Sequence, residues 1–384
     1  MLLTRGKTMA QRVRILLLIP HLGGGGAEQV TALLARGLCR EKYDVHLGLA
    51  TQADADPKQL PPWVKLHAIG AHRVRTAALP LLRLVWRLKP DLIVSGMAHL
   101  NFLVLLLRPF FPPGTRVMVR QNATVSAILA FGGLPRYTRL LYRWLYRSAD
   151  RVICQTPAMA NDLASELGIP KRRLAVLHNP VDVDAIRKAV EEHQSQLSEQ
   201  TSSSLRPHLL AIGRLSREKG FDLLLRALVI VRERFPRTDL TIFGTGPEEA
   251  SLKAETSRLG LDAAVHFAGY VAAPHAHFPN ASLFVLPSRH EGLPNSLLEA
   301  AAAGLPIVAF PASEGLKELL RNQPGAWLAP QITPEALAAT LITALEVLRP
   351  GERFAHSFIR EFRFDSAIHA YEGLIDRVLE ERRR

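Results

Sequence analysis

Short runs of consecutive apolar residues alternate along the chain with longer segments in which apolar residues recur at helical spacing. Continuous apolar runs are typical of parallel strands that are covered on both faces by helices. In the first half of the chain, strands are predicted at Val13–Ile19, Asp44–Ala50, Val64–Ile69, Asp91–Ser95, Arg116–Arg120, Arg151–Gln155 and Leu174–His178. In the second half, they are predicted at His208–Ile212, Asp239–Phe243, Ala264–Ala268, Leu283–Pro287, Ile307–Phe310 and Ala326–Ala329. The pattern predicts an α/β protein with two Rossmann-like, doubly wound domains.

A polar, Ser- and Gln-rich stretch separates the two blocks and is predicted to be a linker, residues 188–207. The first domain is then expected at 1–187 and the second at 208–355. The remaining residues, 356–384, contain an amphipathic helical pattern and are expected to pack back on the first domain. Ligands of parallel sheets bind beyond the carboxyl ends of the strands, so the cleft between the domains is the expected site.

Charge is distributed unevenly along the chain, whose formal net charge is +13. Residues 1–187 hold 26 of the 48 basic and 11 of the 35 acidic residues, or +15, which leaves 22 and 24, or −2. This imbalance predicts an anionic partner for the first domain: nucleic acid, anionic lipid or a phosphorylated acceptor. No nucleic-acid recognition motif accompanies the charge, so nucleic acid is not expected.

The two cysteines, Cys39 and Cys154, lie in apolar segments and predict buried thiols in a reducing compartment. The apolar run Ile15–Ile19 is too short for a signal peptide and ends at Pro20, so we expect a buried strand. The run Phe102–Phe111 contains an arginine and is too short to span a bilayer. We therefore expect a cytoplasmic protein that contacts the inner face of the cell membrane peripherally.

Two glycine-containing loops follow predicted strands. Gly23–Gly26 precedes a helix and allows backbone amides to approach a phosphate, although a flexible turn has the same composition. Arg214 and Lys219 leave the strand His208–Ile212 on one short loop, where two cations could clamp a diphosphate. Glu218 could instead pair with either cation. The segment after Gly269, Tyr270 and Val271, could meet a nucleotide base or form a plain turn.

The stretch "RHEGLPNSLLEAAAAGLP" places two glutamates, Glu291 and Glu299, around the start of a helix. Glu299 stands in an apolar run, and burying a carboxylate is costly unless a protein group or a ligand hydrogen-bonds it. Pro294 suits the first turn of a helix, whose free amides would favour a phosphate; these belong to Asn295, Ser296, Leu297 and Leu298. A capped helix with a glutamate near its positive end explains the same residues without a ligand.

The segment "EGLPNSLLEA" matches the E-x7-E motif of retaining glycosyltransferases with the GT-B fold. Further segments match that group in order and spacing: "GRLSREKGFDLLLRAL", "IFGTGPEEASLKAE", "VHFAGYV", "VICQTPAMANDLASELGIP" and "LHNPVD". The chain resembles glycosyltransferase family 4 over nearly its whole length. The resemblance implies a GT-B fold and a nucleotide-sugar donor, which we expect to be a UDP-sugar.

Carried over by position, the resemblance assigns the diphosphate to Arg214 and Lys219, and the ribose to Glu299. Glu291 would hold the transferred sugar, and further donor contacts are expected from Gly24, Gly25, Gly292, Leu293, Asn295, Ser296, Leu297, Tyr270 and Val271. No metal or other cofactor is expected, because the cations and a helix terminus neutralise the leaving group.

Many relatives carry a histidine near the reacting carbon, but this sequence has "RQNAT" after the corresponding strand. Asn122 or His99 is therefore expected at the reaction centre. No enzyme base is apparent, which suits a retaining, front-face transfer. The transferred group would be a hexosyl or N-acetylhexosaminyl unit. A nucleotide-sugar-binding protein without transferase activity and an inverting GT-B enzyme remain alternatives.

Four arginines recur at helical spacing beside aromatic residues: Arg136, Arg139, Arg143 and Arg147. A basic stripe with aromatic neighbours suits an anionic membrane surface, whereas a solvated face with aromatics turned to the core is the alternative. The acceptor is expected to be a lipid-linked or cell-surface glycan, of the lipopolysaccharide, exopolysaccharide or undecaprenyl-linked type.

Overall fold

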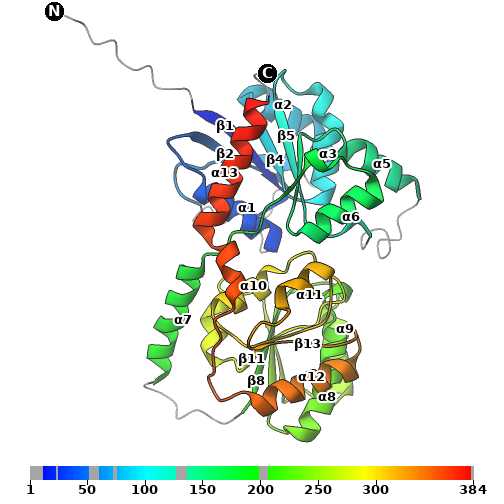
Figure 1. Cartoon of the computed structure of the whole chain (residues 1–384), viewed down its shortest axis with the longest axis vertical. Coiled ribbons are helices and arrows are strands. Elements are labelled where there is room, and N and C mark those ends of the chain that lie inside the picture. Colours follow the sequence, from blue (N-terminus) through cyan, green and yellow to red (C-terminus); the bar gives the residue numbers. More distant parts are fainter. Residues whose placement is uncertain are drawn as a thin grey trace, which may run out of the picture.

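The computed structural model describes residues 12–22, 25–51, 60–71, 76–126, 136–198 and 206–381. Thirteen strands form two fully parallel sheets, one in each half of the chain (Figure 1). The first sheet has the order β3-β2-β1-β4-β5-β6-β7, and the second has the order β10-β9-β8-β11-β12-β13. The predicted α/β architecture of two Rossmann-like domains is confirmed, and every predicted strand is present within two residues at each end.

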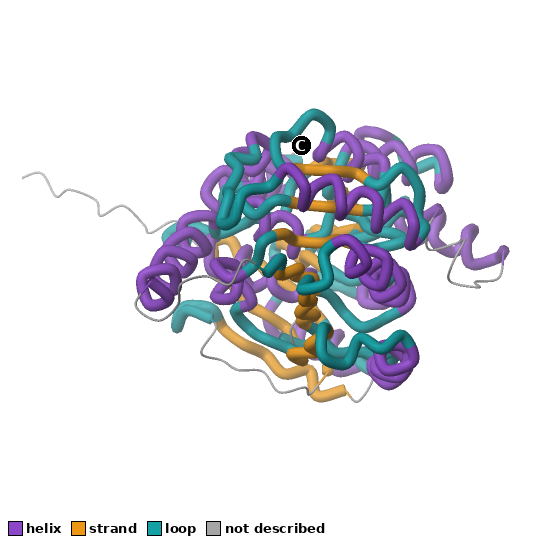
Figure 2. Tube along the Cα trace, turned by 90° about the horizontal axis from the view of Figure 1, so that it is seen from below, coloured by secondary structure: helices purple, strands orange, loops and turns teal. Residues whose placement is uncertain are grey.

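The strands of the first sheet are β1 (Val13–Ile19), β2 (Tyr43–Thr51), β3 (Lys65–Ala71), β4 (Leu92–Ser95), β5 (Arg116–Gln121), β6 (Arg151–Cys154) and β7 (Leu174–Val176). Those of the second are β8 (His208–Ile212), β9 (Asp239–Phe243), β10 (Val265–Gly269), β11 (Leu283–Leu286), β12 (Ile307–Ala309) and β13 (Ala326–Leu328). Helices lie on both faces of the sheets (Figure 2). This layering explains why the strands are apolar along their whole length.

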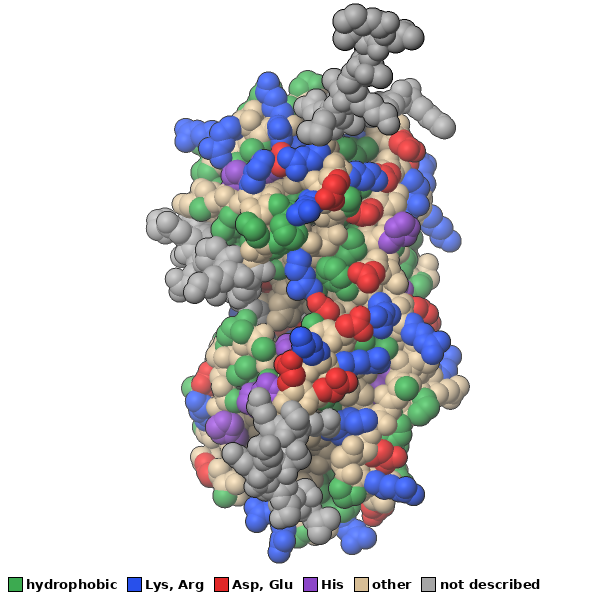
Figure 3. All heavy atoms as spheres, turned by 90° about the vertical axis from the view of Figure 1, so that its left-hand side faces the viewer, with side chains coloured by type: hydrophobic (Ala, Val, Ile, Leu, Met, Phe, Trp, Pro, Cys, Tyr) green, Lys and Arg blue, Asp and Glu red, His purple; other side chains and the backbone are tan. Residues whose placement is uncertain are grey.

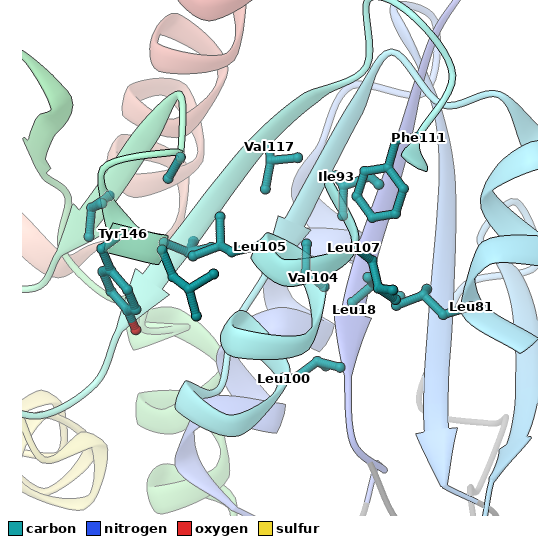
Figure 4. Packing of buried hydrophobic residues seen from close by; sticks show 14 of the residues in the cluster. Leu18, Leu81, Ile93, Leu100, Val104, Leu105, Leu107, Phe111, Val117 and Tyr146 are labelled. Atoms are coloured by element: carbon teal, nitrogen blue, oxygen red, sulfur yellow. The ribbon is translucent and has the colours of Figure 1, made fainter. Parts of the chain in front are cut away.

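The helices of the first domain are α1 (Gly26–Gly37), α2 (Ala78–Leu88), α3 (Ala98–Leu107), α5 (Arg136–Tyr146) and α6 (Pro157–Leu167). Side chains of α2, α3, α5 and α6 pack on one face of the sheet. Figure 4 shows Val104 and Leu107 of α3 against strand residues such as Ile93 and Val117. The opposite face is covered by α1 and by the last helix of the chain.

The second domain contains α8 (Phe221–Arg234), α9 (Glu249–Arg258), α10 (Asn295–Ala302), α11 (Glu314–Leu320) and α12 (Pro334–Val347). After a 3-10 helix, α13 (Phe364–Glu380) returns to the first domain, where it packs beside α1 (Figure 1). A Cβ atom added at Gly37 of α1 would lie 2.5 Å from Ile368 of α13, so the glycine allows the two helices to approach closely.

The segment expected to be a polar linker, residues 188–207, begins as a helix instead. Helix α7 covers Val183–Ser198, and its apolar residues Ile186 and Val190 pack into the core of the second domain. The linker interpretation is therefore wrong for residues 188–198, because the polar composition belongs to the exposed face of an amphipathic helix. Residues 199–205 lie outside the described residues.

Candidate functional site

Two helix N-termini meet where the domains face each other. Helix α1 begins at Gly26 after Gly25, and α10 begins at Asn295 after Pro294. The Asn295 side chain bridges the two ends, because its Nδ2 donates to the carbonyl oxygen of Gly26 at 2.7 Å. Free amides and the helix dipole favour an anion at each terminus, so this junction suits a phosphate-bearing ligand. Gly24 lies outside the described residues.

Gly292 is required by a close approach between the domains. A Cβ atom added there would lie 2.3 Å from the carbonyl oxygen of Asn122, which follows β5 in the other domain. The structure thus brings Asn122 to the loop that carries Glu291. Its side chain is already engaged, since Nδ2 donates to the carbonyl of Gly96 and Oδ1 accepts from Gln155 Nε2 at 3.2 Å.

His99 lies in the first turn of α3, at the same edge of the first sheet, and is exposed. The buried carboxylate of Glu28 in α1 lies 3.9 Å from His21, and its charge acts on His99. Sequence reasoning did not single out Glu28. Its position three residues after the N-cap Gly25 is the capping-box position, which is the signal that could have identified it.

The cationic loop after β8 lies beside the first glutamate of the motif. Lys219 Nζ donates to Glu291 Oε1 at 2.6 Å, and Ser288 Oγ donates to the same oxygen at 2.7 Å. Arg214 is exposed, and its guanidinium has no hydrogen-bond or ion-pair partner among the described residues. Glu218, the expected alternative partner of these cations, accepts from Ser216 instead. Of the two predicted clamp residues, Lys219 is thus paired with Glu291, whereas the guanidinium of Arg214 is exposed.

Glu299 lies on α10 and is half-buried. Within the described residues, no hydrogen bond or ion pair engages its carboxylate, and burial raises its pKa to about 7. It lines a pocket of about 310 Å³ together with Gln29 and Arg36 of α1, and with Asp182, His275 and Asn295. Arg36 forms an ion pair with Asp182 at 2.5 Å on the pocket wall. A half-buried carboxylate that faces a cavity has acceptor sites available for the hydroxyl groups of a ligand.

The other predicted donor contacts differ in how accessible their side chains are. The side chains of Leu293 and Leu297 are buried in the core of the second domain, so only their backbone atoms could touch a ligand. Tyr270 follows β10 and is 51% exposed, whereas Val271 packs against the core. Ser296 is half-buried in the first turn of α10.

The basic stripe on α5 faces α6. Arg139 Nε donates to the carbonyl of Glu166 at 3.0 Å, and Arg147 Nη2 donates to the carbonyl of Gly168 at 2.9 Å. These arginines therefore cap the C-terminus of α6. The side chain of Arg136 lies outside the described residues. Arg139 and Arg143 are nevertheless exposed, and α5 also exposes three apolar side chains: Leu140 is 67%, Leu141 44% and Trp144 66% exposed.

No helix in the described part of the chain has the length and apolar character needed to cross a membrane. The same residues contain no group of three or more His, Cys, Asp or Glu side chains that could hold a metal ion. Figure 3 shows one flank of the molecule, on which basic and acidic side chains are intermixed. The molecular surface is indented between the two domains.

Comparison with known proteins divides the chain at the same place as the two sheets. Residues 24–185 match the profile described as Glycosyltransferase Family 4, and residues 206–347 match that of Glycosyl transferases group 1. An uncharacterised glycosyltransferase of Haemophilus influenzae is 35% identical over 133 residues, which are 35% of this chain and 38% of that protein.

A longer match covers 85% of the chain and 89% of a Campylobacter jejuni protein, at 26% identity. That relative is named N-acetylgalactosamine-N,N'-diacetylbacillosaminyl-diphospho-undecaprenol 4-alpha-N-acetylgalactosaminyltransferase. Among solved structures, the Anabaena protein HepE in complex with UDP and glucose has a TM-score of 0.76 at 19% identity. That match covers 95% of this chain and 100% of HepE. The ordered motifs, the two matching domains and this architecture identify the chain as a GT-B protein of glycosyltransferase family 4.

Proposed function

We propose that this protein is a retaining glycosyltransferase that moves a sugar from a nucleotide-sugar donor, a UDP-sugar, to a lipid-linked or cell-surface glycan. The observation that carries the proposal is Glu299, a carboxylate that faces a cavity and has no hydrogen-bond or ion-pair partner in the part of the chain that the structure describes. Ribose hydroxyls would supply the missing hydrogen bonds. The diphosphate would then reach Arg214, Lys219 and the N-terminus of α10, which together neutralise its charge.

The proposed reaction uses the protein to position and stabilise charge. The bond between the anomeric carbon and the diphosphate oxygen breaks while a bond to the acceptor oxygen forms on the same face of the sugar. The acceptor hydroxyl transfers its proton to the leaving phosphate oxygen, so no enzyme base is needed. Cations and a helix terminus aimed at the leaving oxygen stabilise the charge that develops there.

Glu291 is assigned to the transferred sugar. Lys219 and Ser288 hold one of its carboxylate oxygens, which fixes the side chain at the edge of the donor loop. The second oxygen can then accept from sugar hydroxyls, because an ionised carboxylate has about four acceptor sites. Asn122 and His99 lie on the opposite side of the cleft and are assigned to the reaction centre.

The proposal also includes a lipid-linked acceptor and contact with an anionic membrane surface. The Campylobacter relative is named for an undecaprenol-linked substrate, which supports a lipid-linked acceptor here. The exposed apolar residues Leu140, Leu141 and Trp144 would enter the interfacial region of an anionic membrane. The net charge of +15 on residues 1–187 would attract that surface.

The stereochemistry of a transfer product tests the proposal. The protein is incubated with α-linked UDP-sugars and lipid-linked oligosaccharide acceptors, and the new linkage is assigned by NMR. The proposal predicts an α-linked product. A β-linked product would identify an inverting enzyme. Tight donor binding without turnover on any acceptor would instead favour the nucleotide-sugar-binding alternative.

A further inference from the structure

Three polar side chains form a continuous chain of hydrogen bonds from the first domain into the second. Arg120 Nη2 donates to Asn179 Oδ1 at 2.8 Å. Asn179 Nδ2 donates to Asn295 Oδ1 at 2.7 Å, and Asn295 Nδ2 donates to the carbonyl of Gly26 at 2.7 Å. The chain therefore begins in β5, enters the donor-side helix α10 and returns to the first turn of α1.

The order of donors and acceptors in this chain is set by the arginine. A guanidinium can only donate, so Asn179 must turn its oxygen toward Arg120. That orientation directs the Asn179 amide nitrogen at Asn295, which must then present its own oxygen. The Asn295 nitrogen is consequently left to donate to Gly26. Arg120 thus determines the orientation of an amide that spans the cleft.

The cost of the arrangement indicates that fold stability is not its main purpose. Arg120 is only 1% exposed, and its Nε and Nη1 atoms have no partner in the described structure. Burying a charge with so few hydrogen bonds is unfavourable, and apolar replacements of such groups are often neutral or stabilising. Asn179 is also buried, at 2% exposure, at the point where the chain passes between the domains.

We propose that Arg120, Asn179 and Asn295 form an inter-domain latch that holds the N-terminus of α1 against the donor-side helix α10. Arg120 and Asn179 act as positioning residues, because they reach the site only through Asn295. The expected effect of the latch on turnover rests on the proposed function. The arrangement of the two domains, which the latch fixes, can be measured without substrate. Latched, the N-termini of α1 and α10 face each other; unlatched, the first domain can swing away from the donor site.

Asn179→Asp separates the latch from the fold. The new carboxylate pairs more strongly with Arg120, so the first domain is expected to remain folded. It cannot donate to Asn295 Oδ1. If Asn295 rotates to donate to the carboxylate, its oxygen faces the carbonyl of Gly26, so one acceptor–acceptor contact results in either orientation. Asn161→Asp, an exposed change of equal charge on α6, is the matched control.

The test combines small-angle X-ray scattering with donor titration and kinetics. For Asn179→Asp we expect an unchanged melting temperature, a larger radius of gyration and UDP affinity within about twofold of wild type. The turnover number should fall by about tenfold, the effect of losing one hydrogen bond in the assembled site. Asn295→Ala also removes a side chain of the donor pocket, so its readout is the radius of gyration, which should rise as it does in Asn179→Asp. Combining Asn179→Ala with Asn295→Ala should lower turnover no further than Asn295→Ala alone.

The following results would contradict the inter-domain latch. An unchanged radius of gyration in Asn179→Asp would overturn the latch, as would an equal change in Asn161→Asp. Additive losses in the double variant would also overturn it, because they would mean that the two asparagines act independently. If wild type shows no transfer at all, the proposed function fails, but the scattering comparison still decides the latch.

Discussion

The affinity for a UDP-sugar should rise as the pH increases from 6 to 8, because Glu299 must be ionised to accept hydrogen bonds from two ribose hydroxyls. Burial raises the pKa of this carboxyl to about 7, from an ordinary value of 4.5. Hydrogen bonds donated by the ribose favour the charged form, so the pKa falls again when the donor binds. Below pH 7, binding therefore includes the cost of removing a proton.

The magnitude follows from the titration. With a pKa of about 7, roughly one tenth of the carboxylates are ionised at pH 6 and roughly nine tenths at pH 8. If only the ionised form binds, the dissociation constant should fall by about tenfold over that range. The ligand-free protein should respond in the opposite sense. The raised pKa stabilises the fold below pH 4.5, and that contribution, about 3 kcal/mol, is lost as the pH rises through 7.

Isothermal titration calorimetry at pH 6, 7 and 8 measures the effect. An intact UDP-sugar is the right ligand, because the terminal phosphate of free UDP titrates near pH 6 and would add its own slope. Glu299→Gln is the main control: it retains one acceptor oxygen and cannot ionise, so its affinity should be weaker and independent of pH.

Other titratable and charged groups in the same pocket are His275, Arg36 and Asp182. Burial lowers the pKa of His275, so this side chain loses its proton at a lower pH than an ordinary histidine. A His275→Gln variant should therefore retain the pH response of wild type between 7 and 8. Equal wild-type affinities at pH 6 and pH 8 would show that ionisation of Glu299 does not control donor binding, as would an unchanged pH dependence in Glu299→Gln.

The remaining predictions concern the diphosphate clamp, the domain junction and the membrane. Arg214→Ala and Lys219→Ala should each weaken UDP binding by roughly 1.5–3 kcal/mol, measured by titration, and unchanged affinity in both would remove the clamp from the site. Gly292→Ala should lower turnover while UDP affinity holds, because its Cβ would lie 2.3 Å from the Asn122 carbonyl oxygen; wild-type turnover would mean that this approach is not needed. Changing the three exposed apolar residues of α5 to serine should release the protein from anionic vesicles in co-sedimentation. Changing Arg139, Arg143 and Arg147 to glutamine should mainly lower the melting temperature, because two of these arginines hydrogen-bond carbonyls at the end of α6. The reverse pattern would identify the arginine stripe, and not the apolar residues, as the membrane contact.

Local patterns predicted the elements well because each strand is an uninterrupted apolar run between polar segments. Val13–Ile19 and His208–Ile212 are strands over the same residues that their composition indicates. The start of α10 is also a local feature, since Pro294 and the following residues specify a helix N-terminus without reference to the rest of the chain. The position of Glu299 beside a cavity could also be anticipated locally, because burying a carboxylate in an apolar helix is costly unless a protein group or a ligand hydrogen-bonds it.

Contacts between residues that are far apart in the sequence could not be predicted from local patterns. Helical spacing showed that the arginines of α5 form one stripe, but it did not show that the stripe faces α6 and leaves Trp144 outside. Asn179 and Asn295 are 116 positions apart, and their contact depends on how the domains close. The polar start of the expected linker had the composition of a loop, whereas the buried side of α7 is formed by a few apolar residues spaced along it.

Thermal stabilisation by a panel of UDP-, GDP- and ADP-sugars tests most directly whether the cleft is a nucleotide-sugar site. A donor present at 100 times its dissociation constant stabilises the folded state by about 2.7 kcal/mol. We predict a concentration-dependent rise in the melting temperature of wild type with UDP-sugars, reduced in Lys219→Ala and in Glu299→Gln. If no sugar nucleotide raises the melting temperature, or if both variants respond as wild type does, the cleft lined by Lys219 and Glu299 is not a nucleotide-sugar site.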